Sequence, residues 1–107
     1  MIVSTTHTLQ GKKVERYLGV VSGEAIMGAN VVRDFLASVT DVIGGRSSSY
    51  ENKLAEGREI ALREMQEKAQ RLGANAVIGV DLDFETLRDG MMMCVATGTA
   101  VYMKDEE

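Results

Sequence analysis

The sequence predicts a small α+β domain with two layers, an antiparallel sheet and a long helix that covers one of its faces. Three observations support this class. Segment 13–21 is rich in β-branched, aromatic and aliphatic residues, and segment 48–72 has apolar residues at a helical period. Segments 76–86 and 91–103 resemble strands joined by a short turn, so with an extra helix before the long one the elements follow the order β, α, α, β, β.

The first strand is expected over residues 13–21, because Gly11 precedes this run and Ser22-Gly23 follows it. Its apolar residues are Val14, Tyr17, Leu18, Val20 and Val21. A short apolar start at Ile2-Val3 adds a possible edge strand.

An extra helix is expected from Asn30, since apolar residues recur there at spacings of three and four and Gly44-Gly45 supplies a stop. The long helix follows at Ser48, which forms a Ser-x-x-Glu capping box with Glu51. Gly73 is its predicted C-terminal cap. The predicted buried stripe consists of Leu54, Ala61, Met65, Ala69 and Leu72, with Ile60 pointing away from it.

The last two strands form a predicted hairpin around Arg88-Asp89-Gly90. Segment 76–86 alternates apolar and acidic residues, which is typical of a strand with one wet face. Segment 91–103 is apolar on both faces, and such strands are usually buried on both. One helix cannot cover both faces, so we expect copies of the chain to shield one another in a homo-oligomer.

Composition limits the classes of function. The 107 residues fill one domain, 1–107, and the formal net charge of −4 predicts no binding to nucleic acid or to anionic membranes. No apolar run reaches the roughly 20 residues that cross a bilayer. Cys94 is the only cysteine and no secretory signal is evident, so we expect a cytoplasmic protein.

Two kinds of ligand site are suggested by the residue types. Arg46, Ser47 and Ser48 place a cation, two hydroxyls and free backbone N–H groups at a helix start, where anions are readily held, although Gly44-Gly45 can also simply join two helices. Cys94 and Met92 share a strand face and offer soft metal ligands, with plain core packing as the alternative.

Asp81 and Asp83, followed by Glu85, share another strand face and offer oxygen ligands for a divalent cation. An acidic face on an edge strand also protects against aggregation, and this alternative stays open. No catalytic residues are predicted, because neither His7 nor Cys94 belongs to a recognisable catalytic motif. We therefore expect no enzymatic activity.

Seven segments of the chain resemble one known family in order and spacing. They are Ser4-Thr5-Thr6, residues 19–25 and 28–30, Arg33-Asp34, residues 44–47 and 72–77, and Gly98-Thr99-Ala100-Val101. They are similar to the YbjQ-like family of small bacterial proteins, which is described as heavy-metal-binding. The resemblance implies a dodecin-subunit-like β-α-β-β fold and a ring-shaped homopentamer in which short extra strands join the subunits.

Taken together, the sequence predicts a non-enzymatic oligomeric module that binds a heavy-metal ion or small ligand at subunit contacts. The cofactor is unknown, with a divalent or soft metal ion as the candidate. The alternative is a purely structural or protein-recruiting ring without a ligand.

Overall fold

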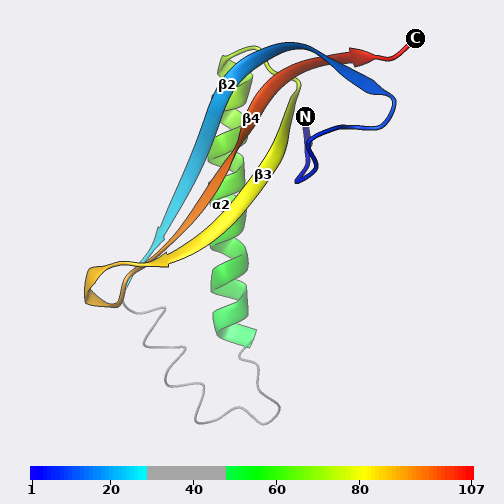
Figure 1. Ribbon diagram of the computed structural model, residues 1–107. Coiled ribbons are helices and arrows are strands. Elements are labelled where there is room, and N and C mark those ends of the chain that lie inside the picture. The colour runs from blue at the N-terminus through cyan, green and yellow to red at the C-terminus, as the bar shows by residue number, and fades with distance from the viewer. Residues whose placement is uncertain (29–47) are drawn as a thin grey trace.

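The computed structural model describes residues 1–28 and 48–107, and Figure 1 shows their arrangement. The described elements follow one another in the order β1, β2, α2, β3, η1 and β4. Their bounds are β1 Ile2–Val3, β2 Lys12–Met27, α2 Ser48–Arg71, β3 Ala76–Thr86, the 3-10 turn η1 Arg88–Gly90, and β4 Met92–Asp105. The helix predicted from Asn30 and its stop at Gly44-Gly45 lie outside the described residues.

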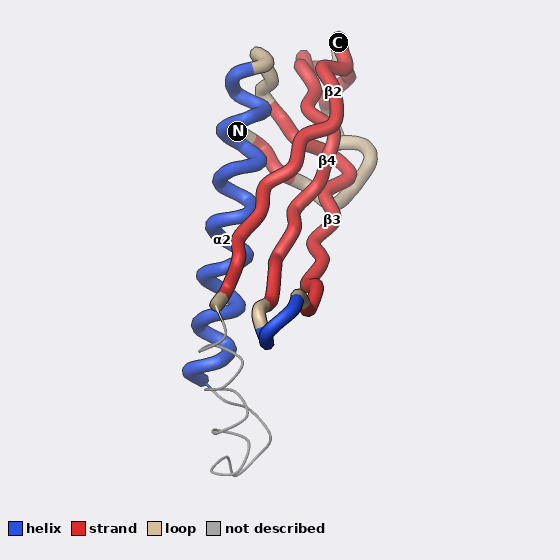
Figure 2. The backbone as a smooth tube through the Cα atoms, turned by 90° about the vertical axis from the view of Figure 1, so that its left-hand side faces the viewer, coloured by secondary structure: helices blue, strands red, loops and turns tan. Residues whose placement is uncertain are grey.

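The strands form one mixed sheet in the order β1-β3-β4-β2. The three long strands are antiparallel to their neighbours, as predicted, whereas the two-residue β1 pairs with β3 in parallel. The helix runs along one side of this sheet, mainly over β2 and β4, and the opposite side has no helix among the described residues (Figure 2). The predicted two-layer α+β class is therefore confirmed. The described residues span 56 × 28 × 15 Å.

Strand β2 is longer than the sequence predicts. We expected it to end at Ser22-Gly23, but it continues to Met27, paired with β4 throughout. Gly23 is required here because the helix lies directly on it. A Cβ at this position would come within 2.6 Å of the Met65 backbone nitrogen. The glycine therefore permits close packing between helix and sheet instead of ending the strand.

The helix buries the centre of the predicted stripe. Ala61, Met65 and Ala69 are fully buried, and Ile60 is exposed as expected. Leu72 corrects the prediction, because it lies beyond the end of α2 and is 48% exposed. Gly73 follows with a φ of 87°, so the chain leaves the helix through the left-handed conformation that favours glycine.

The N-terminal segment covers part of the sheet face opposite the helix. There Ala76, Ile78, Val101 and Met103 form a second buried cluster, packed against Leu9 and Val14. The segment also hydrogen-bonds to β3 beyond β1: Ser4 N–H donates to the Val77 carbonyl at 2.9 Å and Gly79 N–H to the Thr6 carbonyl at 2.8 Å. It therefore covers both one end of this face and the adjoining edge of β3.

Candidate functional site

The register of the sheet divides the predicted site residues between two faces. Directly opposite residues in paired strands point to the same side of a sheet. Cys94 lies between Ala25 and Phe84, in a row that faces the helix. Val95 lies between Glu24 and Asp83, in the adjacent row that faces the other side. The soft ligands and the carboxylates of the sequence prediction are therefore on opposite faces.

Cys94 is fully buried beneath the helix. Gly57 of the helix lies directly above Met27 and Cys94. A Cβ built on Gly57 would be 3.2 Å from the Met27 sulfur and 3.8 Å from the Cys94 Cβ. Burial raises the pKa of the Cys94 thiol, while Arg58 acts in the opposite direction. The thiol is therefore protonated at neutral pH, and a metal–thiolate bond would require the helix to lift from the sheet.

Met92 shares the helix-facing side with Cys94, as predicted from strand alternation. It pairs with Met27 across the strands and packs, half-buried, against the same core. Three sulfur-containing side chains, those of Met27, Met92 and Cys94, thus lie at one end of the core. As metal ligands Cys94 and Met92 stay predictions; in the structure they fill space beneath α2.

Asp81 and Asp83 are exposed on the opposite face, where α2 does not lie. Hydrogen bonding to Asp81 raises the pKa of Asp83, and the negative charges of Asp81 and Glu85 raise it further. The carboxylates thus repel one another. Glu24 lies two strands away on the same face, in register with Val95. The sequence did not place Glu24 on this face, because Ser22-Gly23 was expected to end the strand; the alternation beyond Gly23 was the available signal.

The described residues do not form a complete metal site in one copy of the chain. Among residues 1–28 and 48–107, no group of three or more His, Cys, Asp or Glu side chains is arranged to hold a metal ion. Cys94 and Asp83 lie on opposite faces of the sheet. The only histidine of the chain, His7, lies beside Gly79: a Cβ built on Gly79 would be 3.2 Å from the His7 Nδ1. The side chains of Cys94, Asp83 and His7 therefore do not converge on one point.

The predicted anion site falls mostly outside the described residues. Arg46 and Ser47 belong to the undescribed part of the chain. Ser48 is the first residue of α2 within the described part of the chain. The binding of an anion by Arg46, Ser47 and Ser48 stays a prediction.

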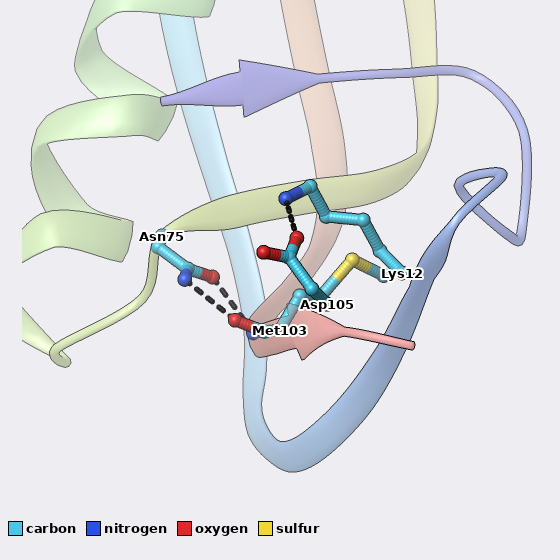
Figure 3. A network of polar contacts seen from close by, with 4 residues as sticks. All are labelled: Lys12, Asn75, Met103 and Asp105. Atoms are coloured by element: carbon cyan, nitrogen blue, oxygen red, sulfur yellow. Dashed lines mark hydrogen bonds and ion pairs between the residues drawn. The ribbon is translucent and has the colours of Figure 1, made fainter. Parts of the chain in front are cut away.

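A polar clamp joins the start of β3 to the end of β4 (Figure 3). The Asn75 side-chain amide donates to the Met103 carbonyl at 2.9 Å, and its oxygen accepts from the Met103 N–H at 2.8 Å. Nearby, Lys12 Nζ and Asp105 Oδ1 form an ion pair at 2.6 Å. A cavity of about 110 Å³ lies beside this clamp. The cavity is small, and its polar lining residues Lys12 and Asn75 already have hydrogen-bond partners, so we interpret the clamp as a structural contact between strands.

A wider groove lies along the outer edge of β2. It has a volume of about 440 Å³ and is bounded by residues 20–22 of β2 and by Lys68, Arg71 and Leu72 at the end of the helix. No motif in the sequence marks Lys68 as a site residue. Its place at the groove follows from the way α2 packs on β2, which periodicity alone does not reveal.

These features define a class: a small α+β domain with a helix on one face of a mixed sheet and an opposite face that carries carboxylates and is covered by no described helix. The chain belongs to the YbjQ-like family, whose model matches residues 1–104 and is described as "Putative heavy-metal-binding". This confirms the resemblance seen in the sequence. It gives the chain a family but no established activity.

Relatives of high identity carry a family name only. The chain is 75% identical over 104 residues to a UPF0145 protein of Geobacillus kaustophilus, covering 97% of this chain and 99% of the relative. It is 68% identical over 104 residues to a UPF0145 protein of Halalkalibacterium halodurans, covering 97% of each.

A solved structure has a similar fold. The crystal structure of a DUF74 family protein of unknown function from Pediococcus pentosaceus matches with a TM-score of 0.66 and 14% identity. The match covers 97% of this chain and 98% of that chain. Within the described part of our chain, no helix is long and apolar enough to cross a membrane.

Proposed function

We propose that this chain is a non-enzymatic, cytoplasmic module that assembles into a ring, a homopentamer by its family resemblance. In this proposal the ring binds a heavy-metal ion or small ligand where subunits meet. The observation that carries it is the sheet face opposite α2, where large apolar side chains are exposed within the described part of the chain. On β2 the side chain of Val20 is 80% exposed and that of Ile26 is 59% exposed, both on the face opposite the helix.

Apolar exposure of this kind supports assembly. Tyr17 joins Val20 and Ile26 on the same face of β2, and Met93 and Val95 of β4 lie beside them, half-buried. Large apolar side chains that gather on one face, rather than being scattered singly, favour contact with another protein surface. A second copy of the chain is always available at the concentration of the first, and closed rotational symmetry is the usual form of homo-oligomers.

We place the ligand between subunits because one copy of the chain offers only incomplete sets of metal donors. The family description supports a metal ion, yet one copy of the chain brings too few donors together within the described residues. Donors from several copies can complete a site around a rotation axis. The same shortage of donors favours the second candidate, a ring without a ligand that serves a structural or protein-recruiting role.

Native mass spectrometry of protein purified without added metal tests the assembly. A pentamer would have a mass of about 58 kDa, five times the 11.6 kDa chain. A chain that stays monomeric at micromolar concentration would overturn the proposal.

Equilibrium dialysis against zinc, cadmium and copper(I) tests the ligand. The metal proposal predicts retention by the assembled wild type, and comparison with Cys94→Ala shows whether the thiol contributes. An intact ring that retains neither metal nor a small molecule would replace the ligand-binding proposal with the structural one.

A further inference from the structure

Among the described strands, the two long edges of the sheet have stretches without a pairing partner, and these edges differ in charge. Strand β2 forms one edge over its whole length. On the other side, β1 and the N-terminal segment cover β3 as far as Val80, whose N–H donates to the Ser4 carbonyl. Beyond that point residues 81–86 pair only with β4 among the described strands. Open edges present backbone N–H and C=O groups that another chain can pair with.

Residues 81–86 of β3 form what we term the acidic edge. It carries Asp81, Asp83 and Glu85, and none of the three has an ion-pair partner within residues 1–28 and 48–107. The raised pKa of Asp83 reflects the crowding of these carboxylates. Phe84 adds an apolar side chain that is 39% exposed. A partner surface with cations and apolar side chains would neutralise these carboxylates and cover Phe84.

The groove beside β2 has those properties, and we term it the basic groove. Lys68 and Arg71 line it together with exposed Val20 and Leu72. Lys68 contacts Glu64 on its own helix at 3.3 Å, whereas Arg71 makes no ion pair with any described residue. The groove is therefore cationic and apolar, the complement of the acidic edge.

We propose that the acidic edge of one copy docks in the basic groove of the next copy. This inference rests on the proposed ring and deepens it by naming the subunit contact. Charge complementarity selects the occupant, because Arg71 makes no ion pair with any described residue and the chain itself carries unpaired carboxylates on its opposite edge. Asp81 and Asp83, which the sequence suggested as cation ligands, thereby serve in subunit recognition.

The contact joins two different surfaces, so it is heterologous. Each copy offers its acidic edge to one neighbour and its basic groove to another. Head-to-tail contacts of this kind generate a ring when the rotation closes. The same contact removes two exposed sheet edges from solvent, which limits uncontrolled pairing with other proteins.

Charge reversal with rescue tests the contact. The variants are D81K/D83K on the acidic edge, K68E/R71E in the basic groove, and the combination of all four changes in one chain. E59K/R63E is the control, since it reverses two exposed charges on the helix away from both surfaces. Sedimentation velocity over a dilution series measures assembly, and far-UV circular dichroism verifies folding.

Each reversal pair should weaken assembly about tenfold or more, because like charges then face each other across the contact. The combined variant should recover assembly, and the control should match wild type.

A monomeric wild type would overturn the ring and this contact together. A wild-type oligomer that D81K/D83K leaves unchanged, or a folded combined variant that stays dissociated, would overturn the contact alone. If a reversal pair does not fold, D81N/D83N and K68Q/R71Q replace it, and unchanged assembly in both would also overturn the contact.

Discussion

The backbone of Gly23 lies against the backbone of Met65, so that a Cβ on the glycine would come within 2.6 Å of the Met65 nitrogen. This close approach fixes the distance between the helix and the sheet. It also places the helix mainly over β2 and β4. The position of the basic groove, which lies between β2 and the end of the helix, therefore depends on this pair of residues.

Gly23→Ala should destabilise the fold by about 1–3 kcal/mol, because the added methyl group forces the helix away from the sheet. Urea denaturation at a fixed protein concentration measures the change. Gly28→Ala is the matched control: a Cβ there meets no atom of residues 1–28 and 48–107 within 4 Å, so its effect should stay below about 0.5 kcal/mol. Equal stabilities of the two variants would show that the helix does not sit on Gly23.

Asn75→Asp should destabilise the fold by about 1–3 kcal/mol, since the replacement keeps the acceptor for Met103 N–H but loses the donor to the Met103 carbonyl. Thermal unfolding followed by circular dichroism tests this. Asn52→Asp makes the same chemical change at an exposed helix position and should have little effect. An Asn75→Asp protein as stable as wild type would contradict the clamp.

Cys94 should be unreactive towards a thiol reagent such as 5,5′-dithiobis(2-nitrobenzoate) in the native protein at pH 8. The thiol is fully buried and its pKa is raised, so both access and thiolate formation are suppressed. In guanidinium chloride the single thiol should react completely. Rapid reaction of the folded protein would place Cys94 on an accessible surface and revive its role as a soft metal ligand.

The Asp105 carboxyl should titrate below its ordinary pKa of 3.8, because Lys12 hydrogen-bonds to its charged form. The pair therefore stabilises the fold above the unfolded-state pKa, and this contribution is lost as the pH falls through the lowered folded-state value. Carbon-13 NMR of the side-chain carboxyl measures the midpoint. Lys12→Gln should move it up towards 3.8, and an unchanged midpoint would contradict the ion pair.

Local pattern predicted most of the described fold. Segment 76–86 coincides with β3, and Ala61, Met65 and Ala69 are buried as the helical period indicated. The wrong predictions concern contacts between distant segments. Gly23 reads as a strand end in sequence, yet it lies within β2 because a helix about 40 residues later packs on it.

The candidate site was less predictable for the same reason. Strand alternation correctly put Met92 and Cys94 on one face, but it could not relate that face to the one that carries Asp81 and Asp83. Only the pairing register shows that the two sets point apart. The groove at Lys68 and Arg71 likewise depends on the way a helix end meets an edge strand, which leaves no periodic signal.

The pairing of β1 and β2 with segments far along the sequence affects the order of folding. Ile2 pairs with Ala76, and Lys12 with Asp105. During synthesis on the ribosome β1 must wait for β3 and β2 must wait for β4, so the sheet cannot close until residues 92–105 have emerged. The nascent chain thus passes through a stage with an unpaired β2, when dilution or a chaperone would protect it from aggregation.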